Sequence, residues 1–415
     1  MSSVTSLPSD GTVSDLQTGW VSQPDSRGTM GILWSCSSTL FICVWVMLHL
    51  NIPARDESFI TVTIRRTKWF VMSLLAPELV MLFAGGQWAA ACRSVKDMKE
   101  SGIEDWTMEH AFYAESGGFE LHTADMAPFP VTARQLLYLI ERGYVSRPHI
   151  TRAEIWDKSK ADRFVKVLAA VQSAWFTLEV IARAAQKLAV TLLELSTLCL
   201  MTCTAATLYF WFYKPLDVKT PNTLNSKVTM AEILLRAGEA GKAPYKDTPL
   251  DFVEPLDYTS TQFPLNRIWG ERRRPLPRIP NDRDSLLHSW NVVVAVSIPT
   301  AAFGTLQLIA WNFEFPTRDE QMLWRWTTVA NGIVLGTGCA LEAAAIIASN
   351  YTLSGLRTFN EYKLRWPWSL TFLVPGILYF VARTITIAEV MISLRALPST
   401  CFQTVKWTSF IPHFS

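Results

Sequence analysis

Long apolar runs, each of roughly 18 to 25 residues with almost no charge, constrain this sequence more than any other feature. A helix of that length spans the hydrocarbon core of a bilayer, whereas a helix of a soluble domain is apolar on one face only. Charged residues are 18% of the chain, against about 25% in soluble domains. The sequence therefore predicts an all-α protein, a bundle of helices that crosses a membrane several times.

Seven such runs are visible, and two large polar segments separate them. The third run is the least certain, because Lys166, Glu179 and Arg183 interrupt it and each charge is costly inside a bilayer. It crosses only if these groups face protein or the interface, and Glu179 and Arg183 stand four residues apart and can pair on one face. We expect seven spans, or six if the third run lies at the interface.

The expected organisation follows from these runs. It comprises a disordered polar tail at 1–30, spans one and two at 31–92, a polar segment with interfacial helices at 93–163, spans three and four at 164–213, a polar segment with a proline-rich basic linker at 214–285, spans five to seven at 286–394, and a tail at 395–415. Three capping boxes predict short helices in the polar segments: Thr132 with Gln135, Thr151 with Glu154, and Thr229 with Glu232. Membrane orientation stays open.

Familiar catalytic motifs are absent from the sequence. There is no Walker loop, no Gly-x-Ser-x-Gly, no His-Glu-x-x-His and no Cys-x-x-Cys pair. The run 281–284 resembles an aspartate motif for diphosphates, but it stands alone and is typical of a helix cap. His110 and His122 lie near acidic residues, where a solvated surface is the default interpretation and a metal site the alternative. We expect no cofactor and no metal, and the net charge of +2 gives no indication of nucleic-acid binding.

Ionisable residues inside the apolar runs are the first candidates for a site, because charges in a membrane are costly and often functional. The runs contain five of them: Glu78, Glu194, Glu342, Arg383 and Glu389. We select Arg383, Glu389 and Glu78 as candidate catalytic residues, with Glu389 or Glu342 as the partner that Arg383 requires. An internal salt bridge that holds helices together is the alternative. A polar patch in an apolar cavity would instead be the usual form of a small-molecule site.

The stretch 311–325, between the fifth and sixth runs, combines aromatic rings with polar groups. We expect it to be an interfacial hinge that turns at Pro316 and forms the rim of a substrate pocket. The candidate substrate-binding residues are Trp311, Asn312, Glu314, Trp324 and Arg325. The competing interpretation is helix capping together with an aromatic belt at the headgroup level.

Several phrases of the sequence together resemble a large family of fungal integral-membrane proteins. They are the stretches 33–36, 49–53, 106–107, 117–119, 156–162, 214–218, 311–325 and 412–413, so the resemblance covers nearly everything from Gly31 onward. Many members of that family are encoded beside genes for polyketide or terpenoid secondary metabolites. A related protein of a sordarin-type diterpenoid pathway is associated with norbornene-forming cyclisation. The resemblance brings no catalytic residues with it.

This resemblance implies a membrane-embedded enzyme of fungal secondary metabolism, in the endoplasmic reticulum, that cyclises a hydrophobic terpenoid-like substrate without a cofactor. An intramolecular cycloaddition fits, because it needs an apolar cavity and one hydrogen-bond donor rather than a nucleophile or a metal. The expected partners are the lipid bilayer, the hydrophobic substrate and other membrane-bound pathway enzymes. Two alternatives stay open: a transporter or binding protein for a lipophilic metabolite, and a membrane scaffold for pathway enzymes.

Overall fold

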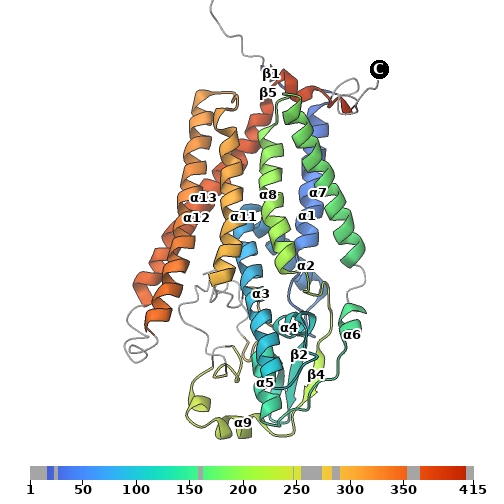
Figure 1. Cartoon of the computed structure of the whole chain (residues 1–415), viewed down its shortest axis with the longest axis vertical. Coiled ribbons are helices and arrows are strands. Elements are labelled where there is room, and N and C mark those ends of the chain that lie inside the picture. The colour runs from blue at the N-terminus through green and yellow to red at the C-terminus, as the bar shows by residue number, and fades with distance from the viewer. Residues whose placement is uncertain are drawn as a thin grey trace, which may run out of the picture.

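The protein consists of a bundle of long helices above a smaller lobe, as Figure 1 shows. The computed structural model describes residues 16–22, 27–157, 162–245, 247–253, 273–282, 290–352 and 365–407. The long helices of the bundle are α1 (Thr29–Met47), α7 (Asp162–Ala185), α8 (Leu192–Phe210), α11 (Trp290–Leu308), α12 (Arg318–Thr352) and α13 (Arg365–Ile392). Two hydrophobic cores stabilise the molecule, one in the upper bundle and one that continues from the lower bundle into the lobe.

Five of these six helices, all except α12, are long and apolar enough to cross a membrane. The pair α2 (Phe59–Leu75) and α3 (Pro77–Glu100) also passes this test when taken together, but it is bent by 112°. The described helices therefore fit a multi-pass membrane protein with five or six candidate spans, fewer than the seven expected. The uncertain third run is one of the five, since α7 contains a candidate span at Phe164–Ala185.

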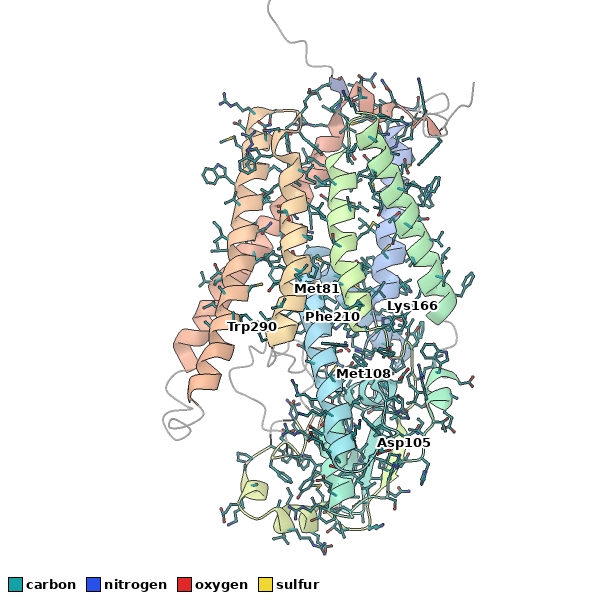
Figure 2. All side chains as sticks on the ribbon, viewed as in Figure 1. Met81, Asp105, Met108, Lys166, Phe210 and Trp290 are labelled. Carbon is teal, nitrogen blue, oxygen red and sulfur yellow. The ribbon has the colours of Figure 1, made fainter. Side chains whose placement is uncertain are left out.

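Helix α3 connects the bundle to the lobe. Figure 2 shows Met81 among the bundle helices and Met108, which follows α3 in the chain, in the lobe. The lower ends of three bundle helices mark the boundary between the two parts, at Lys166, Phe210 and Trp290 (Figure 2). The N-terminus of α3 is consequently inside the bundle, and its C-terminus is inside the lobe.

The lobe combines the two polar segments of the sequence into one folded unit. Its three-stranded sheet has the order β3-β2-β4, with β2 antiparallel to β3 and parallel to β4. Its elements are α4 (Met108–Glu115), β2 (Phe119–Thr123), β3 (Met126–Val131), α5 (Ala133–Glu141), α6 (Arg152–Asp157), β4 (Asn222–Asn225), α9 (Met230–Ala237) and the 3-10 turn η1 (Ala240–Lys242). The all-α expectation is wrong in this detail. Helices α4 and α5 pack into the core of the lobe, and their expected place at a membrane interface stays a prediction.

Two of the three predicted capping boxes form in full. The hydroxyl of Thr132 accepts the Gln135 amide at 3.3 Å, and the Gln135 side chain returns to the Thr132 amide at 3.1 Å. The same two bonds join Thr151 and Glu154 at the start of α6, at 3.2 and 2.6 Å. At the start of α9 only the threonine half is present, with the Glu232 amide 3.3 Å from the Thr229 hydroxyl. These local signals survive because the hydroxyl satisfies backbone donors that no helical carbonyl can reach.

At the upper end, both ends of the described chain meet. Strand β1 (Leu16–Thr18) pairs with β5 (Ala396–Pro398), which lies between the 3-10 turns η3 (Ser393–Arg395) and η4 (Ser399–Phe402). Leu16–Thr18 lies in the range expected to be a disordered tail, so that expectation does not hold for these three residues.

Arg183 and Glu194 organise this upper end. The guanidinium of Arg183 donates to the backbone carbonyls of Ala189, Thr400, Cys401 and Gln403 at 2.8 to 3.3 Å. The expected pairing of Arg183 with Glu179 does not form, because these carbonyls take its N–H groups.

The contacts of Glu194, another charged residue inside an apolar run, are also structural. It completes a capping box with Thr191 and forms a salt bridge with Arg27. Among the described residues, both oxygens of Glu194 and all three guanidinium nitrogens of Arg183 have partners, so we do not place a site at these two residues.

Candidate functional site inside the bundle

The break between α2 and α3 places a helix start inside the bundle. Ala76 separates the two helices, and Pro77 occupies the first position of α3, where its missing N–H costs nothing. Helix α3 packs against α8 and α11, and α2 packs against α13. Glu78, in the first turn of α3, is therefore surrounded by helices of the bundle, and only 5% of its surface is exposed.

The hydroxyl of Tyr379 on α13 holds the Glu78 side chain. It donates to Glu78 Oε2 at 2.7 Å and also lies 3.4 Å from the carbonyl oxygen of Leu75. Glu78 Oε1, in contrast, is buried and has no hydrogen-bond partner among the residues that the structure describes. One oxygen of this carboxyl group is therefore fixed, and the other is available to a further group.

Arg383 lies one helical turn beyond Tyr379 on the same helix. It is 3% exposed, its guanidinium stacks 5.0 Å above the ring of Phe303, and it interacts electrostatically with Glu78 without a direct salt bridge. Its Nε has no hydrogen-bond partner within the described part of the chain. Glu78, Tyr379, Arg383 and Phe303 together form what we call the intramembrane cluster.

The structure separates Glu389 from this cluster. Its carboxyl group lies within hydrogen-bond reach of Glu320 and near Arg395, close to the upper end of α13. Glu389 is thus not the direct partner of Arg383 that the sequence suggested, because Glu320 and Arg395 occupy its surroundings. The side chain of Glu342, the other candidate partner, lies outside the described residues.

The hinge 311–325 folds back on itself. The 3-10 turn η2 (Ile309–Asn312) ends α11, and Arg325 on α12 then donates to the Trp311 carbonyl at 3.0 and 2.9 Å. The same guanidinium stacks 5.1 Å from the Trp311 ring and reaches Asn312 Oδ1 at 3.4 Å. Asn312 and Glu314 are exposed. Capping explains the contacts of Arg325, and the rim of a pocket stays a prediction.

Trp324 differs from the other residues of the hinge. It is 1% exposed and packs in the upper core, with its ring 6.2 Å from that of Phe315. Its indole Nε1 has no hydrogen-bond partner among the described residues. The structure therefore brings Trp324 into the bundle and leaves Trp311, Asn312 and Glu314 at its surface.

A second buried polar group, which the sequence reasoning missed, lies at the boundary between bundle and lobe. Lys214, just beyond α8, is 2% exposed, and its Nζ donates to Asn51 Oδ1 and Gln87 Oε1, each at 2.8 Å. The indole N–H of Trp211 also donates to Gln87 Oε1, at 2.9 Å, and its ring lies 4.6 Å from Nζ. No carboxylate forms a salt bridge with Lys214 in the part of the chain that the structure describes.

The acceptors of Lys214 also hold a distant segment of the chain. Gln87 Nε2 donates to the Asn281 carbonyl at 2.9 Å, and the Asn51 amide donates to Asn281 Oδ1 at 2.6 Å. Asn51 Nδ2 reaches the Pro280 carbonyl at 3.0 Å. We call these residues the Lys214 network. The signal of this network in the sequence is the two stretches 49–53 and 214–218, which carry part of the family resemblance. Their local pattern indicates only helix ends.

Burial lowers the pKa of Lys214 to about 7, because an ammonium group loses its hydration in this position. The amide oxygens and the Trp211 ring supply partial negative charge in place of a carboxylate. The run 281–284 contributes only its first residues to the described structure. Asn281 serves the Lys214 network there, as a polar contact rather than as part of a metal-binding motif.

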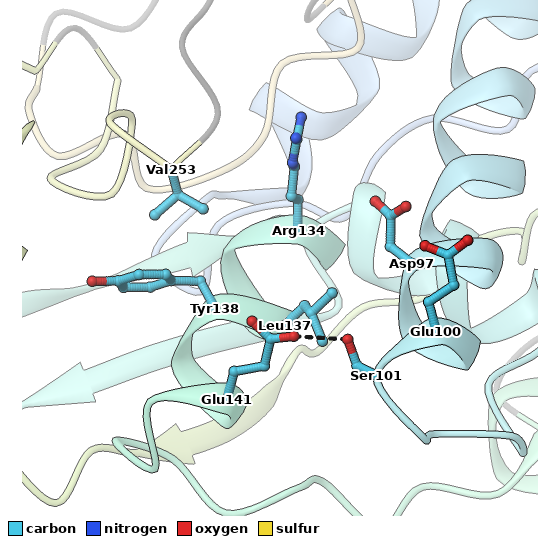
Figure 3. A pocket seen from close by; sticks show the side chains of 8 residues that line it. All are labelled: Asp97, Glu100, Ser101, Arg134, Leu137, Tyr138, Glu141 and Val253. Carbon is cyan, nitrogen blue, oxygen red and sulfur yellow. Dashed lines mark hydrogen bonds between the residues drawn. The ribbon is translucent and has the colours of Figure 1, made fainter.

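The surface of the lobe carries an open hollow of about 390 Å³, lined by Asp97, Arg134, Tyr138 and Glu141 among others (Figure 3). Glu141 accepts a hydrogen bond from Ser101 at 2.7 Å across it. The hollow is open to solvent, and its charged groups mix both signs. We therefore place the candidate site in the bundle and not here.

The histidines of the lobe have structural roles. His110 Nδ1 accepts from the Thr107 amide at 3.2 Å to cap α4, and His110 Nε2 lies 2.9 Å from the Ile150 carbonyl. His122 lies 3.2 Å from Glu120. Among the residues that the structure describes, no three His, Cys, Asp or Glu side chains come together as metal ligands.

Comparison with known proteins gives one match. A family of unknown function, DUF8562, matches residues 4–238 and 283–414, which is well over half of the chain. The protein belongs to the DUF8562 family. No curated protein and no solved structure matches it. The two matched parts of this DUF8562 member contain both the intramembrane cluster and almost all of the Lys214 network.

Proposed function

We propose that this DUF8562 protein is a membrane-embedded cyclase that acts on a lipophilic, terpenoid-like substrate of fungal secondary metabolism. The reaction is an intramolecular cycloaddition at the intramembrane cluster, at the level of the endoplasmic reticulum membrane. In this proposal α12 also crosses the bilayer, beside α11 and α13. The apolar bundle admits the substrate from the lipid and holds it in a reactive conformation.

The observation that carries this proposal is a buried hydrogen-bond donor with nothing to bind. Among the described residues, Arg383 Nε has no hydrogen-bond partner inside the apolar bundle, and Glu78, with which Arg383 interacts electrostatically, also has one oxygen without a partner. A free buried donor is costly unless a ligand or water satisfies it. A carbonyl group conjugated to one reacting double bond of the substrate would satisfy Arg383 and would be polarised by it.

The chemistry balances without a co-reactant. In the cycloaddition two π bonds of one molecule become two σ bonds, and no atom, proton or electron enters or leaves. Arg383 stabilises the electron density that develops on the carbonyl oxygen in the transition state. Tyr379 and Glu78 orient the guanidinium electrostatically, and Phe303 supports its flat face.

The test uses a strain that lacks the gene, complemented with wild type, Arg383→Gln or Arg236→Gln. Arg236 is an exposed residue of α9 that pairs with Glu232 and serves as the matched control. We expect the deletion strain to accumulate an uncyclised precursor, Arg236→Gln to restore the product, and Arg383→Gln to reduce turnover about 100-fold or more. Microsomes that contain wild type should convert the precursor. Equal conversion in control microsomes would overturn the proposal.

Transport of a lipophilic metabolite is the second candidate, and the α2–α3 break favours it. Transporters place substrate sites where a helix is interrupted within the membrane, because the helix start there offers free N–H groups. The same deletion strain distinguishes the two functions. Accumulation of the finished product inside cells, with no uncyclised precursor, would support transport and contradict the cyclase.

A further inference from the structure

Three buried side chains on one face of α12 have polar atoms without hydrogen-bond partners among the described residues. They are Trp324 Nε1, Thr328 Oγ1, and both Oδ1 and Nδ2 of Asn331, with exposures of 1, 4 and 2%. Spacings of four and three residues place them in a single stripe, which extends roughly 10 Å along the helix axis. We call these three residues the α12 stripe.

Thr328 is unusual among the buried threonines of the bundle. A threonine in a helix normally donates its hydroxyl to the carbonyl oxygen four residues earlier. Thr204, Thr207, Thr300, Thr327 and Thr386 all do so, at 2.8 to 3.0 Å. Thr328, directly after Thr327, does not, and its hydroxyl remains available to a group outside its own helix.

The unpartnered atoms have no structural explanation within the described bundle. An apolar residue in each position would avoid the free energy cost of an unsatisfied buried polar group. Asn331 is the strongest case, because its whole amide group is buried without a partner. A stripe of four such atoms indicates a polar group that the protein binds.

The stripe lies at about the same depth in the bundle as the intramembrane cluster. Helices α12 and α13 pack side by side and run in opposite directions (Figure 1), and Glu320 of α12 meets Glu389 of α13. Thr328 follows Glu320 by eight residues along α12. Counting back eight residues from Glu389 along α13 gives a position between Tyr379 and Arg383. Both helices rise by about 1.5 Å per residue, so these positions are at the same depth.

We propose that the α12 stripe binds neutral oxygen groups, hydroxyl or carbonyl, of a lipophilic ligand. An indole N–H, a hydroxyl and an amide supply donors and acceptors but no charge, so they fit uncharged oxygen groups and not a phosphate or a carboxylate. The length of the stripe fits a ligand with two such groups roughly 10 Å apart. That this ligand is the substrate of the cluster rests on the proposed function.

The experiment measures ligand-induced thermal stabilisation of the purified full-length protein in detergent, without any turnover. Two probes are compared. One is the octane diol with a hydroxyl group at each end of the chain, and the other is octanol, which has the same chain and one hydroxyl group. We expect the diol to raise the melting temperature of wild type by roughly 3 °C more than octanol does. This difference should disappear in Thr328→Val and Asn331→Leu and persist in the control Thr327→Val.

The melting temperatures of the ligand-free proteins provide a second test. Thr328→Val and Asn331→Leu should melt at or above the wild-type temperature, because they remove unpartnered groups, whereas Thr327→Val should melt lower. If the first two variants lose stability as Thr327→Val does, or keep the diol effect, the inference is overturned. Because the probe is not a substrate, this result is independent of whether the cyclase activity exists.

Discussion

The Lys214 network and the intramembrane cluster are both buried and polar, and they differ in how completely their groups are paired. In the network, Lys214, Asn51, Gln87 and Trp211 exchange hydrogen bonds, and within the described chain only Asn281 Nδ2 lacks a partner. In the cluster and the α12 stripe, several donors and acceptors are left over.

This difference separates structural from functional polarity. In a fully paired network the hydrogen bonds join chain segments, here the end of α8, the middle of α3 and residues 279–281. A cluster with unpaired donors and acceptors can still bind a ligand. Stability alone does not explain such a cluster, because unpaired buried groups destabilise the fold. The contrast is the reason that we interpret the Lys214 network as structural and propose the bundle interior as the place of ligand binding.

The largest expected effect on stability comes from replacing the buried amide of Gln87 in the Lys214 network, compared with the same kind of change at Asn331 in the bundle. Gln87→Leu leaves the Trp211 N–H, one N–H of Lys214 and the Asn281 carbonyl unpaired, so we expect the free energy of unfolding to fall by about 3 kcal/mol or more. Asn331→Leu, the matched change in the bundle, should alter it by less than about 1 kcal/mol. Chemical unfolding in detergent measures both. Equal losses would remove the distinction between the two regions.

The pH dependence of stability tests Lys214 directly. Its pKa is about 7 in the folded protein, so between pH 7 and its ordinary range the unfolded chain binds the additional proton. The cost of burying the ammonium is fully present below pH 7 and is relieved as the pH rises above it. The free energy of unfolding should therefore increase by up to about 1.4 kcal/mol per pH unit.

Lys214→Met is the control for this measurement, because it keeps an unbranched side chain and removes the titrating group. The slope that Lys214 contributes is the difference between the two curves from pH 7 to pH 9. A wild-type curve that runs parallel to that of Lys214→Met would show that Lys214 stays charged. Its amide and aromatic partners would then replace hydration more fully than burial suggests.

Patterns along the chain predicted the elements whose causes are local. The apolar runs of α1, α8 and α13, the capping boxes at Thr132 and Thr151 and the N-cap at Thr229 depend on neighbours within a few residues, and all of them are present in the structure. The lobe could not be predicted in this way. Strand β4 reaches β2 across about one hundred residues, and neither strand is long enough to signal itself by alternation.

The candidate site was predicted in part, for the same reason. Charge inside an apolar run identified Glu78 and Arg383, because such a charge is costly wherever the chain places it. Their relation through Tyr379 depends on packing between α2, α3 and α13, and no pattern in the sequence encodes that packing. Thr328 and Asn331 were missed because a neutral polar residue in a long helix is common, and only the missing hydrogen bonds make these two unusual.

Tyr379→Phe gives the smallest expected effect. It tests whether Tyr379 only positions its neighbours or contacts the substrate itself. The change removes one hydrogen bond to Glu78, so we expect a loss of about 1 kcal/mol in the free energy of unfolding. If the proposed function holds, turnover should fall by less than about tenfold, since Arg383 would still face the substrate.

Tyr209→Phe, which changes an exposed ring at the end of α8, is the control for the detergent and the assay. If Tyr379 is a positioning residue, the substrate concentration at half-maximal rate stays near the wild-type value while the maximal rate declines. A loss as large as that of Arg383→Gln would instead assign the donor to Tyr379. The phenol would then contact the carbonyl itself, and Arg383 would stabilise the Glu78 carboxylate beside it.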